Sequence, residues 1–155
     1  MTENGGGPFG SVIVRDGKLI ATGSNKVTID NDPTAHGEVV CIRNACKKLG
    51  VYDLKGCELY TSCEPCPMCL ASCYWANISK IYYAANQKDA ASFNFDDAYL
   101  YKEVAKPKKD RKIPIVEVKC SNKCEPFEKW EAKTDKSTYG DNFEGKETSK
   151  KSKFF

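Results

Sequence analysis

The stretch Cys-Glu-Leu-Tyr-Thr-Ser-Cys-Glu-Pro-Cys-Pro-Met-Cys at residues 57–69 joins two predicted elements. Its first half, Cys57 to Thr61, is predicted to be a β-strand. Its second half begins a helix that we predict over Cys66 to Ala76, because prolines are favoured in the first turn of a helix. Cys66 and Cys69 lie three residues apart at the helix start, so their sulfur atoms share one face. The stretch therefore predicts a strand followed by a helix that carries two cysteines on one side.

The segments on either side of residues 57–69 continue an alternation of strands and helices. Asp16-Gly17 is typical of a tight turn between two strands. Gly50 is expected to end a helix whose apolar residues recur at helical spacing. The other predicted strands are 9–15, 19–23, 80–84 and 113–118, and the other predicted helices are 35–49, 99–104 and 126–133. This alternation predicts an α/β sandwich with a mixed sheet of about five strands.

The chain has 155 residues, a formal net charge of +3, nine cysteines and one histidine. An odd number of cysteines without an export signal argues against a disulfide framework. The start Met1-Thr2-Glu3-Asn4-Gly5 lacks the basic and apolar regions of a secretory signal, and no apolar stretch approaches the ~20 residues of a membrane span. We therefore expect a cytoplasmic protein without a membrane partner, in which the cysteines bind metal, take part in catalysis or pack in the core.

One metal site that the cysteines allow is an iron–sulfur cluster. Cys63, Cys66, Cys69 and Cys73 have the spacing C-x2-C-x2-C-x3-C of a bacterial-type iron–sulfur run. Tyr74 stands where a proline usually follows the fourth cysteine, and the remaining cysteines do not form the second run that a two-cluster ferredoxin needs. The sequence therefore disfavours this metal-binding alternative.

A zinc site fits the sequence better. His36-Gly37-Glu38 followed by Pro65-Cys66-Pro67-Met68-Cys69 matches the H-x-E and P-C-x-x-C signature of zinc-dependent nucleobase deaminases. His36, Cys66 and Cys69 would supply three ligands, and the open fourth position is the mark of a catalytic zinc rather than a structural one. Glu38 would not share the face of His36 in the middle of a helix, so this arrangement requires the helix N-terminus to point into the site. His36 is the only histidine, so no other imidazole completes the site.

These residues resemble the cytidine deaminase-like superfamily, and within it the small guanine deaminases of the bacterial type. The resemblance covers roughly residues 6–139. Its further motifs are Gly6-Gly7-Pro8-Phe9-Gly10, residues 31–36, Tyr74-Trp75-Ala76, Phe95-Asp96-Asp97, and Pro126-Phe127 with Trp130. It implies a three-layer α/β/α sandwich. Only a few residues precede Gly6, so we expect the helix that opens the family fold to be missing.

The resemblance implies hydrolytic deamination of guanine to xanthine and ammonia by hydroxide at one zinc ion per chain, with Glu38 as the proton shuttle. It also implies a domain-swapped homodimer whose C-terminal segment closes the partner's pocket. The implied substrate-binding residues are Phe9, Asn25, Trp75, Asp97 and Tyr139.

Simpler roles exist for four of these five residues. By composition alone, Phe9 and Trp75 are core residues, Asn25 caps a turn, and Asp97 is a loop or helix-cap residue. The zinc motif is also compatible with deamination of cytosine, guanosine or tRNA adenosine.

We expect residues 1–139 to form the deaminase domain and the lysine-rich residues 140–155 to form a disordered tail. The formal net charge of +3 is too small to imply a nucleic-acid partner, so none is expected.

Overall fold

A computed structural model describes residues 5–139 of the chain. The predicted tail, residues 140–155, lies outside the described residues. The chain divides after Val104 into two compact units. The first unit contains the strands β1 (Gly10–Arg15), β2 (Lys18–Ser24), β3 (Cys57–Cys63) and β4 (Lys80–Ala85), and the helices α1 (Val27–Asp30), α2 (Gly37–Leu49), α3 (Pro67–Trp75) and α4 (Gln87–Ser92). It also contains α5 (Ala98–Ala105) except for the last residue of that helix.

The four strands form one mixed sheet in the order β2-β1-β3-β4. Strand β1 is antiparallel to β2 and β3, whereas β3 and β4 are parallel and connected through α3. The β1–β2 hairpin turns at Asp16 and Gly17, which both have positive φ, 51° and 72°. Positive φ at both central residues is the backbone of the turn that matches the twist of two hairpin strands. The predicted hairpin is therefore confirmed.

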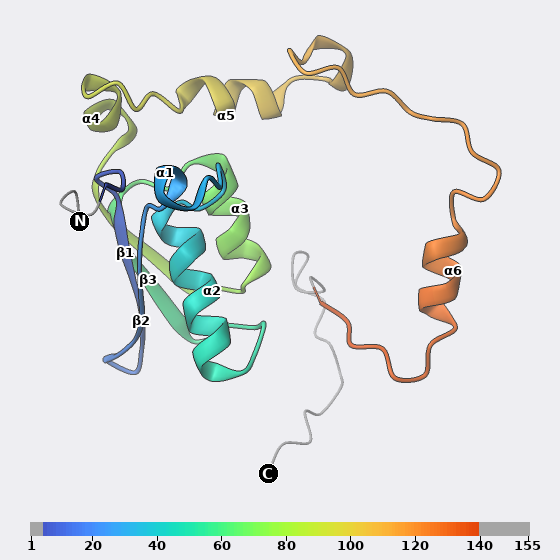
Figure 1. The fold of residues 1–155 in the computed structure, drawn as a ribbon, viewed down its shortest axis with the longest axis horizontal. Coiled ribbons are helices and arrows are strands. Elements are labelled where there is room, and N and C mark those ends of the chain that lie inside the picture. Colours follow the sequence, from blue (N-terminus) through green and yellow to red (C-terminus); the bar gives the residue numbers. More distant parts are fainter. Residues whose placement is uncertain (1–4, 140–155) are drawn as a thin grey trace. The chain divides into compact units, whose positions relative to one another are not determined.

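The core lies between the sheet and the helices α2 and α3, which lie side by side in Figure 1. Alternate residues of the central strands point into it, among them Ile13, Cys57 and Leu59, which are fully buried. The helices contribute small side chains to the same cluster, namely Cys41, Ala45, Cys73 and Ala76. Small residues allow the helix backbones to pack closely on the sheet. Cys41, Cys57 and Cys73 thus act as the buried small hydrophobes that the sequence predicts.

The sheet differs from the prediction in its strand count and its layers. The expected fifth strand, residues 113–118, pairs with no strand among residues 5–139, and its apolar residues are exposed. Pro114 lacks a backbone donor, so the segment is poorly suited to the interior of a sheet. Tyr60 and Thr22, whose side chains point away from α2, are also exposed. The first unit is therefore an α/β fold with a mixed four-stranded sheet flanked by helices, and residues 5–104 do not form a helical layer on the second sheet face.

The second unit is described from residue 105 to residue 139. It contains a short 3-10 helix, η2 (Lys108–Asp110), and the helix α6 (Glu125–Glu131). An ion pair between Glu125 and Lys129 spans one turn of α6. No helix among residues 5–139 is long and apolar enough to cross a membrane.

Candidate metal centre and active site

The three predicted metal ligands meet at the starts of two helices. His36 is the N-cap residue of α2 and Cys66 is the N-cap residue of α3, and neither side chain caps its own helix. Their backbones are extended, with ψ of 154° and 168°, which turns both side chains away from the helix and leaves them available as ligands. Cys69 lies one turn into α3 and is buried. Residues 30 positions apart are thus brought to one point.

The spacing of the three ligand atoms fits a zinc ion. The Nδ1 atom of His36 lies 3.7 Å from the Sγ atom of Cys66 and 3.5 Å from the Sγ atom of Cys69. Tetrahedral zinc with N and S ligands has an N-to-S edge of about 3.6 Å, from bond lengths near 2.0 and 2.3 Å. Within residues 5–139 these three residues form the only histidine, cysteine and carboxylate group close enough to hold a metal ion. Cys63 and Cys73 stand outside that group, so the iron–sulfur alternative is wrong.

The charge environment of the triad favours ionisation of one of its two thiols. Hydrogen bonds from Cys69 and His36 lower the pKa of Cys66 to about 4, against the opposing effect of burial. The hydrogen bond with Cys66 also raises the pKa of His36. The N-termini of α2 and α3 both adjoin the site, and a helix N-terminus stabilises nearby negative charge. The site therefore favours a thiolate at Cys66, which is the form in which cysteine binds zinc. The hydrogen bond between the two thiols raises the pKa of Cys69.

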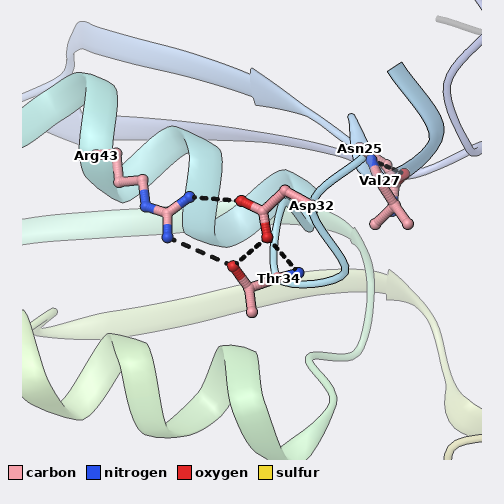
Figure 2. A network of polar contacts seen from close by, with 5 residues as sticks. All are labelled: Asn25, Val27, Asp32, Thr34 and Arg43. Carbon is pink, nitrogen blue, oxygen red and sulfur yellow. Dashed lines mark hydrogen bonds and ion pairs between the residues drawn. The ribbon is translucent and has the colours of Figure 1, made fainter. Parts of the chain in front are cut away.

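A polar network holds the loop that delivers His36 (Figure 2). One carboxylate oxygen of Asp32 accepts hydrogen bonds from the backbone N–H and the hydroxyl of Thr34, at 2.8 and 2.6 Å. These bonds, above all, lower the pKa of Asp32. Arg43 of α2 contacts Asp32 at 3.4 Å and the Thr34 hydroxyl at 3.5 Å. The loop is thus tied to the helix that it precedes, which fixes the start of α2 and the position of His36.

Glu38 lies beside the metal triad because α2 begins there. It is the second residue of the helix and its side chain is only 6% exposed. Burial raises the pKa of its carboxyl group. One of its oxygens, Oε1, accepts a hydrogen bond of 3.4 Å from the Thr61 hydroxyl. The requirement that the helix N-terminus point into the site is met.

A cavity of about 420 Å³ opens above these residues, and three of the five predicted substrate-binding residues line it. Phe9 lies at one wall and packs edge-on against Phe95, with ring centroids 5.0 Å apart. The side-chain oxygen Oδ1 of Asn25 accepts a hydrogen bond from Val27 N–H at 3.2 Å (Figure 2), so this amide has its oxygen engaged and its NH2 group left as the donor. The Oδ1 atom of Asp97 is buried and has no hydrogen-bond partner among the described residues, and burial raises the pKa of this carboxyl. His36, Glu38 and Cys66 border the same cavity.

The other two predicted residues are not among the residues that line this cavity. Trp75 is the last residue of α3 and is 54% exposed. Tyr139 belongs to the second unit and is 68% exposed. The first unit by itself thus assembles the metal ligands, Glu38 and part of the predicted substrate site.

Two residues next to the site were not predicted from the sequence. Thr61 contacts Glu38, as described above. Tyr101 of α5 donates a hydrogen bond of 2.7 Å to the carbonyl oxygen of Pro65, the residue before Cys66. This bond ties the segment that carries Phe95 and Asp97 to the metal loop. Thr61 follows the alternation of buried residues in β3, which is a local signal, whereas the contact of Tyr101 leaves no mark on the sequence.

Comparison with known proteins places these observations in a family. Residues 1–85 match the model of the cytidine and deoxycytidylate deaminase zinc-binding region. The chain is 54% identical to guanine deaminase of Bacillus subtilis over 134 residues, which is 86% of each protein. The X-ray structure of that guanine deaminase is similar with a TM-score of 0.86 and 52% identity, over 88% of this chain and 87% of the other. A tRNA-specific adenosine deaminase of Agrobacterium fabrum is 46% identical over 78 residues, 50% of this chain and 51% of that protein.

Proposed function

Because the chain belongs to the cytidine and deoxycytidylate deaminase zinc-binding family, we propose that it is a zinc-dependent guanine deaminase that converts guanine to xanthine and ammonia. The observation that supports this proposal most is that one cavity is bordered by two of the metal ligands, His36 and Cys66, and also by Glu38 and Asp97. The chain is 54% identical to guanine deaminase over 86% of its length, whereas a tRNA-specific adenosine deaminase that matches a similar share of the chain, 87%, is 31% identical. The substrate assignment rests on this difference in identity.

The chain supplies the metal site and the proton transfers. His36, Cys66 and Cys69 would hold the zinc ion, which would lower the pKa of a bound water toward neutrality. Glu38 takes a proton from the attacking water and delivers it to the ring nitrogen beside C2 of guanine. It then takes the second proton from the hydroxyl group newly bonded to C2 and passes it to the amino group, so that the C2–N bond breaks, ammonia leaves and the C2 carbonyl forms, which is general acid–base catalysis. A buried carboxyl suits both roles because its raised pKa lies closer to neutrality.

Three residues of the cavity wall are proposed to bind the purine. The Asn25 amide donates a hydrogen bond to an acceptor on the base, because its carbonyl oxygen is already engaged by Val27. Asp97 accepts from the amino group or a ring N–H of guanine, which would satisfy its buried Oδ1 atom. Phe9 contacts the purine ring and is held in place by Phe95. Contacts of Trp75 and Tyr139 with the base stay predictions.

A homodimer is proposed to complete the site. The second unit exposes Phe127, Trp130 and Tyr139, and large exposed aromatic side chains are typical of interaction surfaces. We propose that this unit exchanges with a partner subunit and that Tyr139 closes the partner's cavity. Sedimentation of the full chain should give a dimer, and a strictly monomeric chain that turns over guanine would contradict the exchange. The cytoplasmic location stays a prediction from the sequence.

The proposed function is tested by measuring ammonia release from guanine, guanosine, cytosine, adenine and a tRNA. We expect turnover of guanine with xanthine as the product. The variant Glu38→Gln should lose activity by a factor on the order of 10² to 10⁴ while its zinc content stays at one per chain. Turnover of another substrate in place of guanine overturns the substrate assignment. Unchanged activity of Glu38→Gln overturns the role of Glu38.

A further inference from the structure

Three polar side chains, leaving cysteines aside, are buried among residues 5–139, and they form a single chain of contacts. They are Ser11, Glu38 and Thr61, which are 5%, 6% and 7% exposed. The Ser11 hydroxyl donates to the Thr61 hydroxyl oxygen at 3.1 Å, and the Thr61 hydroxyl donates to Oε1 of Glu38 at 3.4 Å. Buried polar groups are costly unless they are hydrogen-bonded. Every member of this chain is bonded, and the chain ends on the carboxyl group of the proposed proton shuttle.

The register of the sheet brings these three polar side chains together. Ser11 of β1 and Thr61 of β3 are cross-strand partners, and both point to the sheet face on which α2 packs. Glu38 lies at the start of α2, at the end of the sheet where His36 and Cys66 meet. Side chains of directly paired residues lie about 5 Å apart on one face of a sheet. The two hydroxyl groups therefore lie between the backbone of the sheet and the carboxyl group.

The number of hydroxyl protons fixes the direction of these hydrogen bonds. A hydroxyl has one proton to donate. The Thr61 proton is used on Glu38, and Ser11 supplies a proton to the oxygen that Thr61 leaves as an acceptor. Because the Ser11 hydroxyl donates a hydrogen bond to the Thr61 oxygen, it favours the Thr61 conformation whose own hydroxyl proton faces Glu38. Both hydroxyls thus act on a single carboxylate oxygen, Oε1.

Packing alone does not explain a threonine at this position. Valine has the same branched shape, has high β-propensity and has no hydroxyl to desolvate. The burial of a hydroxyl at residue 61 is offset by its hydrogen bonds to Ser11 and Glu38, which valine could not make.

We propose that Thr61, supported by Ser11, is a positioning residue that holds Oε1 of Glu38 and leaves Oε2 to exchange protons with water and substrate. This inference rests on the proposed deaminase function. Catalysis is sensitive to such positioning, because a misplacement of about 1 Å costs on the order of 100-fold in rate. Thr61 itself does not border the substrate cavity, so its effect should fall on kcat rather than on substrate binding.

The test compares Thr61→Val, which loses the hydroxyl and keeps the shape, with Thr61→Ser, which keeps the hydroxyl. We expect kcat for guanine to fall about 10-fold to 100-fold in Thr61→Val, with KM within about twofold of the wild type and one zinc per chain. Thr61→Ser should stay within about threefold of the wild-type kcat. Ser11→Ala should lower kcat in the same sense as Thr61→Val but less. Thr22→Val removes an exposed hydroxyl from the same sheet and serves as the matched control.

Several results would overturn the inference. Thr61→Val with wild-type kcat would do so, and so would Thr61→Ser with the same loss as Thr61→Val, because that pattern indicates packing. If Thr61→Val does not fold, an unchanged kcat in Ser11→Ala overturns the proposed positioning of Glu38. A wild-type chain that does not use guanine refutes the substrate assignment alone, and the variants are then compared on the substrate that it does use. A zinc-loaded wild type that is inactive on every substrate overturns both the proposed function and the positioning role of Thr61.

Discussion

Replacing Gly23 by alanine should separate strand β2 from helix α2. An ideal Cβ atom at residue 23 would lie 2.4 Å from the Cys41 nitrogen, 2.4 Å from the Gly37 carbonyl oxygen and 2.7 Å from the Cys41 Cα atom. All three atoms belong to the backbone of α2, so no side-chain rotation relieves the clash. Ordinary contacts begin at 3.4 Å, and the helix must therefore move away by about 1 Å, which places the energetic cost at the upper end of the range for overpacking.

We expect this displacement to lower the free energy of unfolding by about 3 kcal/mol. For a chain of this size, such a loss lowers Tm by about 6–12 °C. Gly37 begins α2 beside His36 and Glu38, so guanine turnover should also fall, by up to about 100-fold. Thermal unfolding of the zinc-loaded protein, followed by circular dichroism, measures the first effect and the ammonia assay measures the second.

The control for Gly23→Ala is Thr22→Val on the same strand, which should change the free energy of unfolding by no more than about 0.5 kcal/mol because the side chain is exposed. A Gly23→Ala variant that melts with the wild type would refute the close approach of β2 and α2. A loss of stability without a loss of activity would refute the coupling of this contact to the position of Glu38.

Two further predictions concern the metal and the cavity wall. Removal of zinc with a chelator should abolish activity and lower Tm, because an ion at 100 times its Kd stabilises the folded state by about 2.7 kcal/mol. Added zinc should restore both, and an unchanged Tm would contradict metal binding by the triad. Tyr101→Phe removes the hydrogen bond to Pro65, worth about 1 kcal/mol, and should raise KM for guanine roughly fivefold with little change in kcat. Tyr99→Phe changes an exposed residue of the same helix and serves as the control. Equal KM and kcat in the two tyrosine variants would show that the bond between Tyr101 and Pro65 does not position the wall of the substrate cavity.

The metal centre was predictable because its determinants are local. The spacing of Cys66 and Cys69 places two sulfur atoms on one face of a helix start, and His36 with Glu38 marks a second helix start. Each half is a short motif whose chemistry restricts the residue types. Only the folded chain brings the two motifs together, and the distance of 3.5 Å between Nδ1 of His36 and Sγ of Cys69 shows that they meet.

The fifth strand was a wrong prediction for a physical reason. Residues 113–118 are rich in β-branched side chains, which predicts an extended segment. A strand also requires a neighbouring edge with which to pair, and β-propensity carries no information about that edge. Within residues 5–139, no strand pairs with this segment.

The sequence by itself determined the chemistry of this protein: the zinc ligands, the carboxyl group beside them, the hairpin and the principal helices. Each depends on residues within one turn or one strand, where spacing along the chain is also spacing in space. Only the tertiary structure decided which distant side chains act together. Ser11 and Thr61 are 50 residues apart and meet through strand register, and Tyr101 reaches the metal loop across 36 residues. Such contacts depend on how strands pair and helices pack, and no local pattern of residue types encodes them.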